Sequence, residues 1–425
     1  MGRGSQAGRR HLALVFAVGL AVAVPGAGPV GAATMAPGDA PIDAVVQFDS
    51  LPPGPAWSPI RRVATNVDIS PGGTIARTIG VEHNWLHAVY WKKNVLYRRS
   101  KDGGATWGAA KALTDTVQLL GRPSGATSGS YVHVAWARRV IDQLTEQPGV
   151  AIFVRSNPHH GRADAWNRVV RLTPRSGEVR APAIAVSGAT VYVAFSDLRE
   201  DVTRLMISRD NGATWISKTV GSGYEEDFEG VPVAVPIVAA AGDNVMVAWL
   251  AAGGVAPARV STDRGRHFSA PVALGDGLSS AAALKGRIAL TGSAYGEAWV
   301  RSWKDGTWGP SRALPDLMLG ADTANLVSPD VVLRKGGRVG VVLSAQVDLD
   351  EDLSREEITW LKSSDNGVTW SSPRRVSPVV DVNDPMSARH PSAVWANKTG
   401  RLWVAWEQET TPADGYRYLA VRSKD

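Results

Sequence analysis

Ser100-Lys101-Asp102-Gly103-Gly104-Ala105-Thr106-Trp107 is the first of three segments that match the pattern Ser-x-Asp-x-Gly-x-Thr-Trp without a mismatch. The other two cover residues 208–215 (SRDNGATW) and 363–370 (SSDNGVTW), and residues 261–268 (STDRGRHF) keep the Ser, Asp, Gly and an aromatic residue. Two further copies are eroded, at residues 156–166 (SNPHHGRADAW) and 302–308 (SWKDGTW). The pattern predicts a tight turn, because the Asp side chain bonds nearby backbone and Gly accepts a positive φ, with the aromatic residue starting the next strand.

Two other repeated elements accompany these turns. Each aromatic residue is followed five or six residues later by Val or Leu, as in Trp57…Val63, Trp107…Leu113, Trp166…Leu172, Trp215…Val220, Phe268…Leu274, Trp308…Leu314 and Trp370…Val376. A strand pair resembling Pro-x-Ile-Ala…Gly…Val-Tyr-Val-Ala-Phe lies between them and is clearest at residues 182–195, 236–249 and 391–406. Its alternating apolar residues are typical of half-buried strands. Each repeat is therefore expected to hold four short strands, with the Asp-containing turn joining the third strand to the fourth.

The two ends of the repeated region complete one repeat between them. Ser423-Lys424-Asp425 matches the start of another turn, and Gly54-Pro55-Ala56-Trp57 matches its second half, followed by a fourth strand through Val63. We therefore predict an all-β fold over residues 54–425, a seven-bladed β-propeller of four-stranded blades. The ring would be closed by pairing the N-terminal strand with the C-terminal three strands, which hides the edges of an open array. A six-bladed ring is the alternative.

The N-terminal residues have the layout of a secretory signal. Arg9-Arg10 precede an apolar stretch at 12–24, and small residues with prolines follow up to Ala32. We expect residues 1–32 to be a signal peptide and 33–53 a flexible leader, so that the protein is secreted or held in the cell envelope. The apolar stretch is short for a bilayer, so retention as an anchor is the less favoured alternative, and no integral membrane span is expected elsewhere.

Composition excludes several classes of function. The chain of 425 residues has no cysteine, which excludes a disulfide scaffold, a Cys-ligated metal site and a cysteine nucleophile. The formal charge is +6, but residues 1–32 hold three arginines and no acid, so the body is close to neutral and gives no case for nucleic-acid binding. The histidines lack the spacing of metal ligands, and the adjacent His159-His160 are expected at the surface. We predict no cofactor and a monomer, and whether calcium binds among the acidic loops stays open.

The repeated turns resemble the Asp boxes, or BNR repeats, of the sialidase-like superfamily, and the resemblance covers nearly all of residues 54–425. Boxes in that family lie on the propeller face opposite the active site, which implies a structural role for Asp102, Asp210, Asp263 and Asp365. Sialidases use three arginines to grip the sialic acid carboxylate, an Asp as acid/base, and a Tyr activated by a Glu as nucleophile. This chain departs from them, because it has no Arg-Ile-Pro motif and its repeats number seven rather than six.

Function is expected where the loops that lead into each blade and the loops between second and third strands converge on the axis. Arg180 and Arg389 precede matching innermost strands, and Arg122 lies at a comparable point of another blade. Three converging guanidinium groups would suit a carboxylate, sulfate or phosphate. The alternative is that each arginine pairs with an acid of its own or a neighbouring blade and braces the ring.

Candidate catalytic groups lie in the same two sets of loops. Tyr224-Glu225 opens the densest acidic run, residues 224–229, and a phenol with a pKa of about 10 needs such a base to act as a nucleophile. A solvated loop or a cation site is the alternative. Asp197 is the best-placed general acid, because a carboxyl group beside apolar Phe195 would have a raised pKa, and a hairpin-bracing ion pair is the alternative.

Two functions stay open at this point. The first is an exported module that binds a glycan or a protein without catalysis, favoured by the missing motif and the blade count. The second is an exo-sialidase-like glycoside hydrolase acting on sialic acid or a related anionic sugar, using Arg122, Arg180, Arg389, Asp197, Tyr224 and Glu225. A two-carboxylate glycosidase acting on neutral polysaccharide is a weaker third. The hydrolase requires its three arginines to point toward one centre.

Overall fold

The computed structural model describes residues 46–47, 57–65, 79–82, 85–115, 119, 121–141, 146, 148–173, 179, 182–222, 236–251, 254–319, 322–348, 354–378, 388–396, 399–409 and 417–424. The chain divides into Met1–Ala40 and Pro41–Asp425, and the second unit contains every described residue. The predicted signal peptide (1–32), and the predicted leader (33–53) apart from residues 46–47, lie outside them. Every regular element in the described ranges is a β-strand. The same ranges contain no helix long and apolar enough to cross a membrane.

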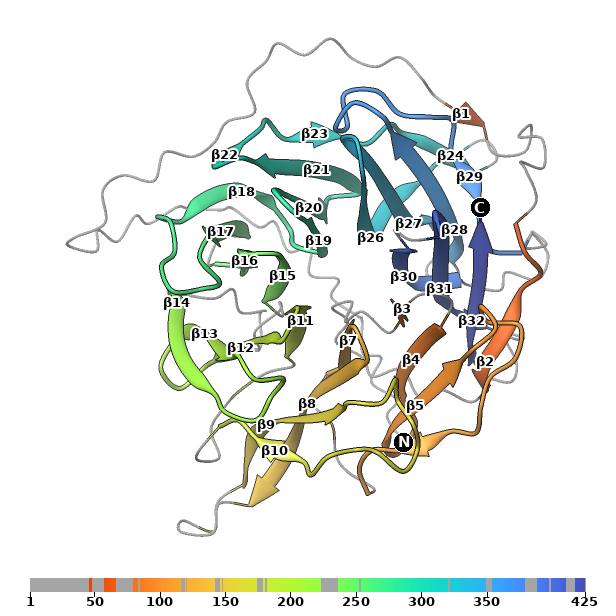
Figure 1. Ribbon diagram of the computed structural model, residues 1–425. Helices are drawn as coiled ribbons and strands as arrows, with labels where there is room; N and C mark the ends of the chain where they lie inside the picture. The colour runs from red at the N-terminus through yellow and green to blue at the C-terminus, as the bar shows by residue number, and fades with distance from the viewer. Residues whose placement is uncertain are drawn as a thin grey trace, which may run out of the picture. The chain divides into compact units, whose positions relative to one another are not determined.

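The strands of Pro41–Asp425 form a seven-bladed β-propeller, in which each antiparallel blade runs outward from an innermost strand (Figure 1). Blade 1 consists of β3 (Ile79–Glu82), β4 (Trp85–Trp91), β5 (Val95–Ser100) and β6 (Lys111–Ala112). Blade 2 consists of β7 (Ser124–Ser128), β8 (Tyr131–Ile141), β9 (Pro148–Asn157) and β10 (Val170–Arg171). Blade 3 consists of β11 (Ala183–Ser187), β12 (Thr190–Asp197), β13 (Val202–Ser208) and β14 (Ile216–Ser222). Blade 4 consists of β15 (Ile237–Ala241), β16 (Asn244–Ala248), β17 (Val255–Ser261) and β18 (Val272–Asp276). Blade 5 consists of β19 (Ser280–Leu284), β20 (Arg287–Ala294) and β21 (Glu297–Lys304), and both β22 (Thr307–Trp308) and β23 (Arg312–Ala313) pair with β21. Blade 6 consists of β26 (Asn325–Arg334), β27 (Arg338–Asp348), β28 (Ser354–Ser363) and β29 (Arg374–Arg375).

Blade 7 is shared between the two ends of the repeated region. It consists of β30 (Ala388–Ala396), β31 (Arg401–Glu409), β32 (Arg417–Lys424) and, outermost, β2 (Arg61–Thr65). Arg61 pairs with Val421 and Thr65 pairs with Tyr418, and Figure 1 shows orange β2 beside blue β32. The predicted seven-bladed fold and its closure are confirmed, and the six-bladed alternative is wrong.

A small additional sheet lies outside the blades. β1 (Val46–Gln47) pairs in parallel with β24 (Leu317–Leu319), which pairs with β25 (Asp322–Thr323). Two residues of the segment predicted as a leader are therefore hydrogen-bonded to the connection between blades 5 and 6.

The four complete or nearly complete turn motifs, residues 100–107, 208–215, 261–268 and 363–370, are called the Ser-x-Asp turns below. In the first of them, Ser100 Oγ donates to Asp102 Oδ1 at 2.7 Å and accepts from Gly104 N at 2.7 Å. Asp102 also accepts from Thr106 N at 2.9 Å and from Thr106 Oγ1 at 2.5 Å, which lowers the pKa of Asp102 to about 2. The same bonds recur at Asp210, Asp263 and Asp365, with His267 in place of Thr in the third turn. Each carboxylate is engaged within its own turn.

The eroded copy in blade 2 is aligned one residue later than its sequence indicates. In intact turns the backbone N–H of the residue after the aromatic donates to the backbone carbonyl of the residue before the serine, as Gly108 N donates to Arg99 O at 2.9 Å. In blade 2 the equivalent bond runs from Asn167 N to Ser156 O at 2.9 Å, so Asn157 occupies the place of the serine. Its Oδ1 accepts from Gly161 N at 2.9 Å, which is the bond that a serine hydroxyl makes elsewhere.

The same one-residue shift applies where the ring closes. Ser58 N donates to Ser423 O at 2.9 Å, so Lys424, and not Ser423, occupies the serine place in blade 7. The strand pairing that the sequence predicts is present, while the match of Ser423-Lys424-Asp425 to a turn motif is displaced by one position.

Four arginines, each two positions before the serine place, join neighbouring blades. In blade 5 that place is held by Trp303, because Gly309 N donates to Ser302 O at 2.8 Å. Arg155 Nε donates to Asn167 O in its own blade at 2.8 Å, and its Nη1 donates to Leu113 O of the preceding blade at 2.8 Å. The same pair of bonds is made by Arg98, Arg301 and Arg422. In each case the preceding blade supplies the carbonyl of the Val or Leu that closes the second repeated element. These arginine clasps give a structural reason for four of the seven copies of that element.

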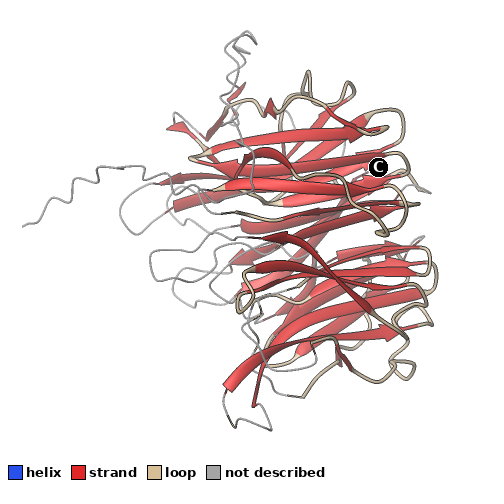
Figure 2. Ribbon diagram, turned by 90° about the vertical axis from the view of Figure 1, so that its left-hand side faces the viewer, coloured by secondary structure: helices blue, strands red, loops and turns tan. Residues whose placement is uncertain are grey.

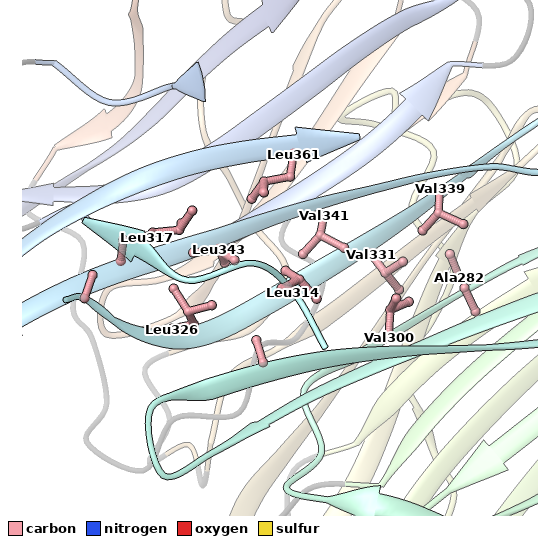
Figure 3. Packing of buried hydrophobic residues seen from close by; sticks show 14 of the residues in the cluster. Ala282, Val300, Leu314, Leu317, Leu326, Val331, Val339, Val341, Leu343 and Leu361 are labelled. Atoms are coloured by element: carbon pink, nitrogen blue, oxygen red, sulfur yellow. The ribbon is translucent and has the colours of Figure 1, made fainter. Parts of the chain in front are cut away.

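Apolar side chains pack between successive blades. In the cluster of Figure 3, buried Val300 and Leu314 of blade 5 meet buried Val331, Val341 and Leu361 of blade 6. Burial of such apolar area is the main stabilising contribution to a propeller without disulfides.

The ring has two faces of different character. Because strands alternate in direction, turns joining first to second and third to fourth strands lie on one side, here called the turn face. The second-to-third connections and the starts of the innermost strands lie on the other side, here called the loop face. Figure 2 shows the short tan turns gathered along its right-hand edge.

Candidate functional site

Side chains from blades 2 and 7 meet on the loop face. Arg122, just before β7, has its Nη2 2.9 Å from Nδ1 of His390 in β30 and 3.4 Å from Oε1 of Glu407 in β31. Glu407 Oε2 is 2.9 Å from the same His390 nitrogen. Blade 1 stands between blades 7 and 2 in the ring, so Arg122 reaches past a whole blade. Arg122 is only 9% exposed.

A bulge in β30 places two consecutive residues, Arg389 and His390, against different partners. Arg389 pairs with Glu407 in the backbone register, and the next register pair is Ser392 with Ala405. Between them His390 has φ 53°, a left-handed conformation that is uncommon for a residue other than glycine. Such strain persists only where the surroundings impose it, and it clusters at functional positions.

Arg389 contacts a second glutamate. Its Nε lies 2.7 Å from Oε2 of Glu356 in β28 of blade 6, and the Glu356 side chain is 8% exposed. The next residue, fully buried Glu357, pairs with Arg375 Nε at 2.6 Å. We call Arg122, Glu356, Arg389, His390 and Glu407 the loop-face cluster.

The cluster contains two of the three predicted arginines. Arg122 contacts His390, the neighbour of Arg389 in the chain, and each arginine also contacts a glutamate of blade 6 or 7. Arg180, Tyr224 and Glu225 lie outside the described residues, so their roles stay predictions. The sequence analysis did not single out Glu356. Two consecutive acids just before the apolar centre of strand 354–363 are the signal that would have identified it.

Asp197 ends β12 and forms an ion pair within its own hairpin. Its Oδ2 accepts from Arg204 Nε at 2.7 Å, and Arg204 also contacts Glu200. The hydrogen bond that Arg204 donates to Asp197 raises the pKa of the Arg204 guanidinium. This is the arrangement expected of the hairpin-bracing alternative.

Another carboxylate, absent from the sequence-based candidates, links three innermost strands. Asp330 of β26 is fully buried, accepts a hydrogen bond from Ser280 Oγ of β19, and accepts from Ala393 N of β30 at 2.6 Å. It therefore joins blades 5, 6 and 7 near the axis. An acid within the apolar strand 325–334 is the corresponding sequence signal.

Within the described ranges, no three His, Asp or Glu side chains are grouped so as to hold a metal ion. The acidic run 224–229, where calcium binding was left open, lies outside those ranges.

Comparisons with known proteins show likeness of fold. No protein-family model matches the chain, and no curated protein matches its sequence. A sialidase from Trypanosoma rangeli is similar in structure, with 13% identity over 88% of this chain and 60% of that chain and a TM-score of 0.49. The phage phi92 endosialidase (10% identity, 86% and 68% covered, TM-score 0.46) and a polysaccharide lyase described as an ulvan lyase (12%, 84% and 85%, 0.40) are similar too. The chain spans less than two thirds of the sialidase.

Proposed function

We propose that this protein is an exported glycan-binding propeller that holds its ligand at the loop-face cluster without cleaving it. One observation carries the proposal: Arg122 contacts His390, the neighbour of Arg389 in the chain, and each of the two arginines is already paired with a glutamate. A guanidinium–carboxylate pair presents hydrogen-bond donors and acceptors side by side with little net charge. Sugar hydroxyls both donate and accept, so they match this arrangement, whereas a clamp for an anion needs uncompensated arginines.

The family assignment and the export route are parts of the same proposal. The Ser-x-Asp turns resemble the Asp boxes of sialidase-like proteins, and this resemblance supports a place in that superfamily. Export rests on the signal-like residues 1–32. A non-catalytic role is supported by the ion pair between Asp197 and Arg204, because the best-placed acid is engaged in its own hairpin.

A sialidase-like hydrolase is the second candidate, favoured by the contact of Arg122 with His390, the neighbour of Arg389 in the chain. In that case the carboxylate of the sugar would have to displace Glu407 and Glu356 from the arginines. Breaking such pairs leaves a glutamate unpaired, which is costly in a largely buried position.

The test uses the secreted protein on a broad glycan array, followed by calorimetry with the best glycan and turnover of a fluorogenic sialoside. Arg122→Met is expected to weaken glycan binding by at least about tenfold. Glu407→Gln keeps the shape of the side chain and tests whether its carboxylate accepts hydrogen bonds from sugar hydroxyls. Arg264→Met is the matched control, because Arg264 forms an exposed ion pair with Asp243 on the turn face. Binding without sialoside turnover supports the proposal. Turnover that is lost in Arg389→Ala, or an array with no bound glycan, overturns it.

A further inference from the structure

A cleft of about 500 Å³ lies on the turn face, where blades 1 and 2 meet. Blade 1 contributes Trp85 at the start of β4, Arg99 of β5 and Lys101 just beyond it. Blade 2 contributes Tyr131 at the start of β8 and the adjacent His159 and His160 after β9. All of these positions are on the side of the ring opposite the loop-face cluster.

Positively charged groups surround an indole ring in this cleft. Arg99 Cζ is 5.3 Å and Lys101 Nζ is 5.6 Å from the Trp85 ring centroid. The His160 ring meets Trp85 edge-on, with centroids 4.7 Å apart and planes at 62°. Trp85 is half-buried, so part of its surface is in solvent. An aromatic surface bordered by cations is suited to a ligand that has both an apolar face and a negative group.

The histidine side of the cleft is held in place by backbone hydrogen bonds. Asn157 Oδ1 accepts from His159 N and Gly161 N, each at 2.9 Å. His160 N donates to Ser130 O at 2.7 Å, and its carbonyl accepts from Arg99 Nη1 at 2.9 Å. Gly161 has φ 70°, and a Cβ there would lie 1.7 Å from the Tyr97 hydroxyl. A turn fixed in this way presents a preformed site and loses little entropy on binding.

The residues that line the cleft carry more positive than negative charge. Those that the structure describes include no carboxylate, and exposed Asp164 nearby pairs with Arg162 at 2.7 Å and also interacts electrostatically with Arg99. The pKa of buried His87 is lowered to about 3, first by burial and then by electrostatic repulsion from His160 and Arg99, which line the cleft.

We propose that this cleft binds an acidic sugar residue, with the pyranose ring against Trp85 and its carboxylate or sulfate against Lys101 and Arg99. The C–H face of a pyranose packs on an indole, and the two cations supply charge-assisted hydrogen bonds to the anionic group. The proposal is independent of the loop-face function, because the two sites share no residue and lie on opposite faces. The propeller would then contact a glycan at two places.

Calorimetry with the full secreted protein tests this site, using a glucuronic-acid disaccharide, its sulfated form, and the neutral methyl ester of the same disaccharide. The ester keeps the ring and removes the charge, so it is expected to bind about tenfold more weakly, and binding of the acid is expected to fall with added salt. Lys101→Gln is expected to weaken binding of the acidic disaccharide about fivefold, and Trp85→Ala is expected to weaken it more than about tenfold. Lys92→Gln is the matched control, because Lys92 is an exposed lysine of the same blade on the loop face.

Melting curves establish that each variant is folded, and Trp85→Phe retains an aromatic ring if Trp85→Ala does not fold. Acid and ester that bind equally well would overturn the proposal, as would full binding in the Lys101 and Trp85 variants. Inorganic sulfate that binds as tightly as the sulfated disaccharide would show an anion site without sugar recognition, which also overturns it. Arg122→Met separates the two sites, because it is expected to leave acidic-disaccharide binding unchanged even if the loop-face proposal fails.

Discussion

Replacing Arg422 with methionine is expected to loosen the closure of the ring. Arg422 Nε donates to Ser58 O at 2.6 Å, and its Nη1 donates to Val376 O at 2.9 Å. One guanidinium therefore joins β32 to the N-terminal segment and to blade 6. A hydrogen bond from a charged donor contributes about 1.5–3 kcal/mol, and methionine preserves much of the packing of the arginine stem. We expect the variant to lose about 3 kcal/mol of unfolding free energy.

The location of the effect is as informative as its size. β2 is held in blade 7 by pairing with β32 and has no covalent connection to it nearby. Loss of the clasp should therefore allow β2 to open locally, at a lower free energy than global unfolding. Urea titration measures the total loss, and hydrogen exchange of the β2 amides measures the local opening.

Arg301→Met is the matched control, because Arg301 makes the same clasp to Gly309 O at 2.7 Å and Ala273 O at 3.0 Å within a continuous stretch of chain. It should lower the urea midpoint to a similar extent without faster exchange in β2. A loss under about 1 kcal/mol in Arg422→Met, with β2 still protected, would show that the clasps do not stabilise the ring.

Two further predictions concern stability. Burial is the main cause that lowers the pKa of His87 to about 3 and of His133 to about 4 from 6.5, so the unfolded state binds more protons than the folded state as the pH falls. The stability that the two neutral histidines contribute is therefore full above pH 6.5 and is lost as the pH falls toward 4. His87→Gln and His133→Gln should make the urea midpoint depend less on pH in that window, and an unchanged dependence would contradict the assignment. Gly340→Ala should destabilise blade 6 by about 2 kcal/mol or more, because the new Cβ would lie 1.8 Å from the Trp360 ring. Gly309→Ala is the control and should unfold at nearly the wild-type temperature, because its Cβ would lie 3.5 Å from the nearest atom, Ser302 O. Equal melting temperatures for the two variants would refute the steric argument.

Several parts of the site could be predicted, and others could not. Arg122 and Arg389 were identifiable because they occupy comparable places near the starts of innermost strands. Their glutamate partners were not, since Glu407 and Glu356 come from different blades and reach the arginines only when the ring is formed. The cleft on the turn face depends likewise on Trp85 and His160, which meet through the packing of blades 1 and 2.

The number of blades, the four-strand plan and the shared blade 7 can be predicted from the amino-acid sequence alone, because they follow from a period and from turns whose side-chain hydrogen bonds stay within eight residues. The Ser100–Asp102–Thr106 bonds are an example of such local determination. The register of the imperfect copies, where Asn157 and Lys424 take the place of serine, follows instead from the folded structure. It is defined by which backbone groups pair between the third and fourth strands, and in blade 7 these strands come from opposite ends of the repeated region. The folded structure also decides which charges pair across the loop face. Arg122 and His390 are 268 positions apart, and an ion pair between blades depends on where the closed ring holds each side chain.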